Sequence, residues 1–152
     1  MKICVVGTGY VGLVSGTCFA DLGNTVVCVD TNQEKLALLN AGKSPFYEPG
    51  LAERITRNSE AKRLFFSDSL VDSMAEADLI FIAVGTPPLS SGQADLSAVF
   101  GVAEAVFNSY AQQALSDFKV LITKSTVPVG TGEKIKAIRD KCGVAESKVA
   151  VM

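Results

Sequence analysis

Residues 3–30 read ICVVGTGYVGLVSGTCFADLGNTVVCVD, a run of apolar and β-branched residues that becomes rich in glycine. The run predicts a buried strand, the glycines a tight turn, and the following residues a helix and a second strand ending at Asp30. Gly7, Gly9 and Gly12 have the spacing of a dinucleotide-binding turn. There the first glycine permits a sharp bend, the second lets a pyrophosphate approach the backbone, and the third lets the helix pack closely on the sheet.

The context of these glycines supports the dinucleotide interpretation, because the same spacing also occurs in ordinary strand-to-helix turns. Asp30 follows Gly12 by 18 positions, close to the offset of about 20 expected for an acid that binds the adenosine ribose. A carboxylate accepts hydrogen bonds from a ribose 2′-hydroxyl and repels a 2′-phosphate, so NAD is favoured over NADP. Lys35 either reaches the same ribose or is solvated. Flavoproteins use the same turn, which leaves FAD as an alternative.

The length and composition indicate one soluble domain. The 152 residues include 14 basic and 16 acidic ones, for a net charge of -2, and no basic run points to nucleic acid or an anionic membrane. No signal-peptide pattern or 18-residue apolar span is present, so we expect a cytoplasmic protein.

The cysteines and histidines limit the chemistry that the chain can perform. The four cysteines lack CxxC spacing, which gives no sign of a metal site. Cys4, Cys18 and Cys28 fall on apolar strands or a helix face, where we expect buried structural thiols. Histidine is absent, so the usual general base at neutral pH is missing.

Apolar runs alternate with helical periodicities along the whole chain, as is typical of βαβ units. We therefore expect an α/β fold of the Rossmann type, with a doubly wound parallel sheet between two helical layers. The predicted strands lie near 2–6, 25–29, 63–67, 79–84, 118–123 and 148–152. The predicted helices begin near Tyr10, Thr31, Pro49, Ser69, Asp95 and Thr131.

Local signals add detail to this prediction. Thr31 and Glu34 have the spacing of a capping box at the start of the second helix, and Gly42 is predicted to end it. Apolar residues at helical spacing between Leu96 and Tyr110 predict a helix face that packs on the sheet. The chain stops inside the last predicted strand, so we expect residues 1–152 to be a fragment of a longer protein.

Three segments are predicted to leave the sheet at its carboxyl edge, where parallel sheets bind ligands. They read SPFYEPG at 44–50, VGTPP at 84–88 and KSTVPVGT at 124–131. Each combines a rigid proline with a hydroxyl or carboxylate that can orient a polar ligand. Taken singly, each is better explained as an ordinary loop, since proline and glycine are common in loops.

Together with the glycine turn, these segments resemble the nucleotide sugar 6-dehydrogenases, and most closely their UDP-glucose branch. The resemblance covers GTGYVG at 7–12, Asp30 with Lys35, and all three segments. It implies an enzyme that oxidises the C6 alcohol of UDP-glucose twice, to UDP-glucuronate, and reduces two NAD. GDP-mannose or a UDP-N-acetylhexosamine is the alternative substrate. A non-catalytic NAD-binding sensor is the alternative of another class.

The resemblance also assigns residues. Val11, Asp30, Lys35, Thr86 and Thr126 are expected to contact NAD, with Thr126 nearest the nicotinamide, where it could also orient a water. The complete predicted cofactor set is Gly7, Gly9, Tyr10, Val11, Gly12, Asp30, Lys35, Thr86, Pro87, Ser125 and Thr126. The family's catalytic cysteine, lysine, asparagine and glutamate lie beyond position 152, so we expect this chain to bind NAD without turnover. Family members are generally dimeric or larger, which implies a homo-oligomeric parent protein.

Overall fold

The computed structural model describes all 152 residues and contains six strands and six helices. The strands are β1 (Lys2–Val6), β2 (Thr25–Val29), β3 (Leu64–Ser67), β4 (Leu79–Ile82), β5 (Lys119–Thr123) and β6 (Val149–Val151). The helices are α1 (Tyr10–Asp21), α2 (Gln33–Asn40), α3 (Leu51–Glu60), α4 (Leu70–Ala75), α5 (Ser97–Gln112) and α6 (Thr131–Lys141).

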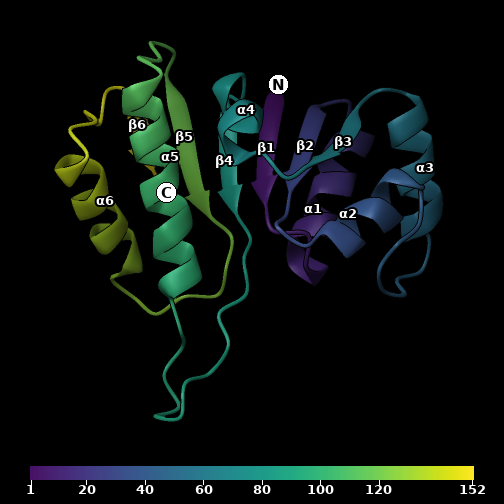
Figure 1. Ribbon diagram of the computed structural model, residues 1–152, viewed down its shortest axis with the longest axis horizontal. Coiled ribbons are helices and arrows are strands. Elements are labelled where there is room, and N and C mark those ends of the chain that lie inside the picture. The colour runs from purple at the N-terminus through teal and green to yellow at the C-terminus, as the bar shows by residue number, and fades with distance from the viewer.

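All six strands are parallel and form one sheet in the order β3-β2-β1-β4-β5-β6. The chain builds β1, β2 and β3 toward one side, then returns to place β4 against the other side of β1 (Figure 1). The strand order therefore reverses between β1 and β4. The predicted doubly wound α/β fold is confirmed, and its ligand crevice is expected at the carboxyl ends of these two strands.

Two apolar clusters cover the two faces of the sheet. Ile3 and Val5 of β1 belong to the cluster beneath α1, α2 and α3, whereas Cys4 and Val6 belong to the cluster beneath α4, α5 and α6. A strand covered on both faces is apolar at every position, since neither side of its pleat meets water. This explains the unbroken apolar run that precedes the glycine turn.

The helix predictions were mostly confirmed, with one correction at α2. The capping box of Thr31 and Glu34 is wrong, because the N-cap is Asn32, whose side chain accepts a hydrogen bond from the N–H of Lys35 at 3.0 Å. Asparagine is a stronger N-cap than threonine and lies one position nearer the helix. Gly42 ends the helix as predicted, with φ of 72° and the N–H of Lys43 bonded to the carbonyl of Leu38.

The thiols follow the prediction at two positions and depart from it at a third. Cys4 and Cys28 are fully buried in the sheet, but Cys18 is exposed. The buried face of α1 consists of Gly12, Leu13, Gly16, Thr17 and Ala20. Cys18 follows Thr17 by one residue, about 100° around the helix, which turns it toward solvent.

The apolar face predicted for α5 is confirmed, since Val99, Ala103, Val106, Phe107 and Tyr110 are all buried. No helix in the structure combines the length and apolar character needed to cross a bilayer.

Candidate cofactor site

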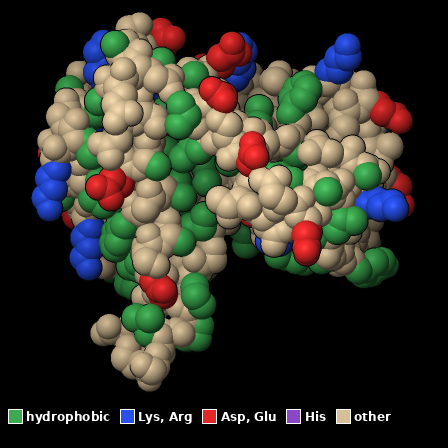
Figure 2. Space-filling view, viewed as in Figure 1, with side chains coloured by type: hydrophobic (Ala, Val, Ile, Leu, Met, Phe, Trp, Pro, Cys, Tyr) green, Lys and Arg blue, Asp and Glu red, His purple; other side chains and the backbone are tan.

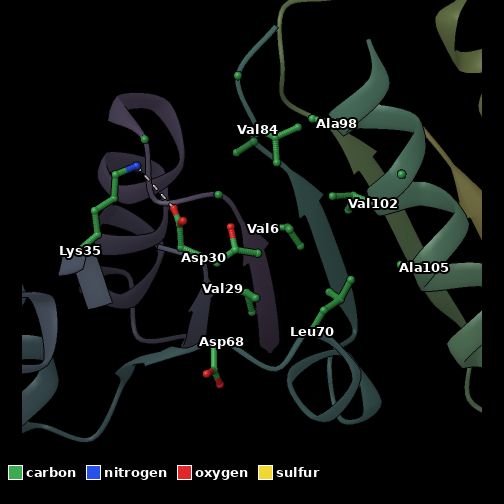
Figure 3. Close-up of a pocket in the computed structure, with 16 residues that line it drawn as sticks. Val6, Val29, Asp30, Lys35, Asp68, Leu70, Val84, Ala98, Val102 and Ala105 are labelled. Carbon is green, nitrogen blue, oxygen red and sulfur yellow. Dashed lines mark ion pairs between the residues drawn. The ribbon is translucent and has the colours of Figure 1, made fainter. Parts of the chain in front are cut away.

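A pocket of about 620 Å³ opens at the carboxyl edge of the sheet, between the glycine turn and α5 (Figure 3). The pocket lies where the strand order reverses. Its lining residues are Val6, Gly7, Gly9, Val29, Asp30, Thr31, Lys35, Asp68, Leu70, Ala83, Val84, Gly85, Ala98, Gly101, Val102 and Ala105. Figure 2 shows apolar side chains gathered in the hollow beside α5, with charged side chains scattered over the surrounding surface.

Gly7 and Gly12 are required by the fold itself. Gly7 has φ of 106°, and a Cβ atom there would lie 2.6 Å from the carbonyl oxygen of Ala83. A Cβ atom on Gly12 would lie 1.9 Å from the carbonyl oxygen of Gly7. Real Cβ atoms do not approach backbone oxygens so closely, so both positions exclude a side chain.

Gly9 differs from its neighbours in the turn. It lines the pocket, but a Cβ atom there would meet no protein atom within 4 Å. Its φ of -70° and ψ of -176° are accessible to any residue. Folding therefore does not require glycine at this position, and the open space beside its backbone suits a pyrophosphate.

The first turn of α1 offers free hydrogen-bond donors next to this space. Gly9 is the N-cap and has no side chain to cap the helix, and the N–H groups of Tyr10, Val11 and Gly12 have no partner in the chain. Unpaired N–H groups at the positive end of a helix dipole bind anions. The turn therefore fits the phosphates of a dinucleotide.

Asp30 lies at the end of β2, and its carboxylate is held on both oxygens. Oδ2 accepts hydrogen bonds from the N–H of Thr8 at 2.8 Å and from its hydroxyl at 2.5 Å, while Oδ1 accepts one from the N–H of Asn32 at 3.0 Å. Nζ of Lys35 lies 3.8 Å from Oδ2, the ion pair drawn in Figure 3. Lys35 thus points toward Asp30 and lines the pocket, which favours the first of its two predicted roles.

These contacts keep Asp30 ionised. Burial alone would raise its pKa, but the hydrogen bonds from Thr8 and Asn32 and the nearby Lys35 ammonium outweigh burial and hold the pKa below its ordinary value. The pocket therefore presents a fixed negative charge, suited to a ribose hydroxyl and opposed to a 2′-phosphate.

The predicted hydroxyl residues meet at the same edge, beyond the ends of β4 and β5. The Thr86 hydroxyl donates to the carbonyl of Thr126 at 3.0 Å, and the two hydroxyl oxygens are 3.5 Å apart. The Ser125 hydroxyl donates to the carbonyl of Val84 at 2.7 Å, so it fastens the two strand ends together. The carbonyl of Pro87 accepts from the N–H of Asp95 at the base of the long loop that projects from this edge (Figure 1).

One predicted segment is placed differently. Residues 44–50 connect α2 to α3, so the prediction that they leave the sheet directly is wrong. They nevertheless contact the end of the glycine turn at Tyr10. The Tyr10 hydroxyl is hydrogen-bonded to Glu48, and the Tyr10 ring stacks on Phe46 with centroids 5.1 Å apart. Tyr10 and Val11 are exposed and do not line the pocket with Gly7 and Gly9.

Sequence reasoning overlooked two features of the pocket. One is Thr8, fully buried between two glycines and bonded to Asp30. The other is the wall made by Ala98, Gly101, Val102 and Ala105 on one face of α5. Small residues at helical spacing are a signal for such a wall. In this helix the larger apolar residues that pack on the sheet make the signal hard to recognise in the sequence.

Comparison with known proteins identifies the family. Residues 1–152 match the sequence profile described as "UDP-glucose/GDP-mannose dehydrogenase family, NAD binding domain". The chain belongs to this family. Its NAD-binding domain forms the whole of the described structure, and NAD is therefore the cofactor that the pocket, the free N–H groups and Asp30 fit.

Relatives and solved structures agree with this assignment. The chain is 46% identical to a UDP-glucose 6-dehydrogenase of Bacillus subtilis over 92% of this chain and 29% of the relative, and 48% identical to one of Rhizobium meliloti over 91% and 31%. It superposes on a GDP-mannose dehydrogenase of Pseudomonas aeruginosa with a TM-score of 0.92 at 31% identity, over 99% of this chain and 35% of that structure. It superposes on a UDP-glucose dehydrogenase of Pyrobaculum islandicum with a TM-score of 0.89 at 39% identity, over 98% of this chain and 34% of that structure. The chain thus spans about a third of the length of these relatives.

Three of the four cysteines, Cys4, Cys28 and Cys142, are poor nucleophiles because of their surroundings. Burial raises the pKa of Cys4 to about 12 and raises that of Cys28 further, so neither thiol ionises near neutral pH. Burial also raises the pKa of Cys142.

Proposed function

We propose that this chain is the cofactor domain of a UDP-glucose 6-dehydrogenase, which oxidises the C6 alcohol of UDP-glucose to the carboxylate of UDP-glucuronate. The observation that carries the proposal is 46–48% identity to UDP-glucose 6-dehydrogenases across nine-tenths of the chain. GDP-mannose is the second candidate substrate, because the GDP-mannose dehydrogenase structure superposes with a TM-score of 0.92, although at only 31% identity.

Each part of the site has a proposed role toward NAD. The free N–H groups of Tyr10, Val11 and Gly12, beside the open space at Gly9, bind the pyrophosphate. Asp30 and Lys35 bind the hydroxyls of the adenosine ribose. The apolar wall of the pocket receives the adenine.

The hydroxyl residues serve the other end of the cofactor. Thr86 and Thr126 leave neighbouring strands at the same edge and lie together, so we assign them to the nicotinamide half, where the Thr126 hydroxyl can orient the ring or a water. Ser125 and Pro87 hold these loops in place through their backbone contacts. When bound, NAD supplies the hydride acceptor, and the residues of this chain fix its position relative to the sugar alcohol.

The proposal for the whole protein includes its partners. The small-molecule partner is the nucleotide sugar, and a homo-oligomeric assembly in the cytoplasm is proposed from the resemblance to the family. Sedimentation of the full-length protein tests the assembly.

The test of function is an assay of the full-length protein with UDP-glucose, GDP-mannose and UDP-N-acetylmannosamine, followed by NADH absorbance. We expect turnover with UDP-glucose and two NADH for each UDP-glucuronate. Faster turnover with another sugar nucleotide would transfer the assignment to that substrate. The 152-residue chain alone is expected to bind NAD and to form no NADH, and NADH formation by it would contradict the proposed division of roles.

A further inference from the structure

Thr8 occupies the second position of the glycine turn and makes an unusual set of contacts for a turn residue. Its side chain is fully buried. Its N–H and its hydroxyl both donate to one atom, Oδ2 of Asp30, at 2.8 and 2.5 Å. A turn between a strand and a helix does not require a buried hydroxyl. The reason for this hydroxyl is therefore to be sought in its effect on Asp30.

The hydrogen bonds leave the two oxygens of Asp30 unequal. A carboxylate oxygen accepts about two hydrogen bonds, and Oδ2 already has two from Thr8. Oδ1 has one, from the N–H of Asn32 at 3.0 Å. One acceptor site thus stays open on Oδ1.

We propose that Thr8 is a positioning residue for NAD: it occupies Oδ2 of Asp30 and so directs Oδ1 to the hydroxyl of the adenosine ribose. This inference rests on the proposed role of Asp30 toward the ribose. In this arrangement the ribose has one direct bond to the carboxylate, and its second hydroxyl lies toward Lys35. The hydroxyl of Thr8 touches no cofactor atom and acts only through Asp30.

Thr8 also stabilises the charge of the acid. The charged groups that face Asp30 are Lys35 of α2, 3.8 Å away, and Asp68, which lines the same pocket after β3. Lys35 is 39% exposed, so water weakens its attraction. The short bond from the buried Thr8 hydroxyl is not exposed to the same competition, and it favours the ionised carboxylate that NAD requires.

The test compares Thr8→Val, which has nearly the same shape but no hydroxyl, with Thr8→Ser, which keeps the hydroxyl. Calorimetric titration of the 152-residue chain should show NAD affinity about ten-fold lower in Thr8→Val, the change expected if the ribose hydroxyl loses its one hydrogen bond to the displaced Asp30 carboxylate. The preference for NAD over NADP should narrow, because the carboxylate is no longer fixed. Thr8→Ser should keep both properties near wild type.

A second measurement separates positioning from a merely structural role. The carboxyl carbon of Asp30, assigned by its absence in Asp30→Asn, is titrated by NMR without cofactor. The pH at the midpoint of this titration should rise in Thr8→Val and stay near the wild-type value in Thr8→Ser. If Thr8→Val does not fold, Thr8→Ala removes the same hydroxyl without placing a methyl group against the carboxylate.

Three results would overturn the inference. The first is wild-type NAD affinity in Thr8→Val, and the second is an unchanged titration midpoint of Asp30 in that variant. The third is a loss of NAD affinity in Thr8→Ser as large as that in Thr8→Val. The Asp30→Ala variant separates the role of Asp30 toward the ribose from the role of Thr8 toward Asp30. If Asp30→Ala binds NAD weakly while Thr8→Val binds normally, only the role of Thr8 fails. If Asp30→Ala binds NAD like wild type, the proposed ribose contact fails and the role of Thr8 fails with it.

Discussion

Replacing Gly9 by alanine separates the folding role of the glycine turn from its role in binding phosphate. An alanine Cβ atom at this position meets no protein atom within 4 Å, and its φ of -70° and ψ of -176° are accessible to alanine. Gly→Ala at a compatible backbone position stabilises a protein by about 0.4–1 kcal/mol, because the unfolded chain loses freedom. The Gly9→Ala variant should therefore unfold at or slightly above the wild-type temperature.

NAD binding should respond in the opposite direction. The new methyl group occupies the open space beside the free N–H groups of α1, where we propose that the pyrophosphate binds. A hydrogen bond to a charged group contributes about 1.5–3 kcal/mol, so losing one such bond weakens NAD binding by roughly ten-fold to a hundred-fold. Thermal unfolding by circular dichroism and calorimetric titration with NAD measure the two quantities on the same sample.

The matched control is Gly12→Ala. Its Cβ atom would lie 1.9 Å from the carbonyl oxygen of Gly7, so this variant should lose stability itself, with a lower unfolding temperature. Wild-type NAD affinity in Gly9→Ala would refute the reasoning, because the space at Gly9 would then have no connection with the phosphates.

Two further variants test the charges. Asp30→Ala removes the ribose acceptor and the repulsion of a 2′-phosphate, so the ratio of NAD to NADP affinity should fall by about ten-fold or more; an unchanged ratio in calorimetric titrations would mean that Asp30 is not the discriminator. Asp21→Asn should lower stability at pH 7, because hydrogen bonds from Asn58, Arg57 and Arg54 lower the Asp21 pKa from 3.8 to about 2. A carboxyl group with a depressed pKa adds stability above its unfolded pKa and loses it as pH falls through the folded one, so the variant's stability should depend less on pH between about 4 and 2 in acid unfolding curves.

The fold was predictable from the sequence because its signals are local. β1 is apolar at every position since both of its faces are covered, and Gly7 and Gly12 have no alternative given the distances to backbone oxygens. The N-cap of α2 was missed for a local reason too. Thr31 and Asn32 are both good caps, and only the backbone geometry shows which side chain reaches the N–H of Lys35.

The site was predictable only in part, because its remaining features depend on contacts between distant segments. Thr8 and Asp30 are 22 positions apart and meet only when β1 and β2 pair. The Tyr10 contact with Glu48 spans 38 positions and joins the turn to the loop between α2 and α3. Spacing in the sequence indicated that Asp30 lies near the turn, but not that Thr8 contacts it, and it gave no information about the pair of Tyr10 and Glu48.

The exposure of Cys18 shows the limit of composition arguments. Cysteine is among the most often buried residues, yet the buried face of α1 is set by Gly12, Gly16 and Ala20, which let the helix approach the sheet. A Cβ atom on Gly16 would lie 2.5 Å from Sγ of Cys28. Close packing of the helix therefore selects the glycines for its inner face and leaves Cys18 outside.

The most direct test of the account is calorimetric titration of the 152-residue chain with NAD, NADP and FAD under identical conditions. The account predicts one NAD bound per chain, with weaker binding of NADP because of the fixed charge of Asp30, and no comparable binding of FAD. Tighter binding of NADP or FAD than of NAD would contradict it.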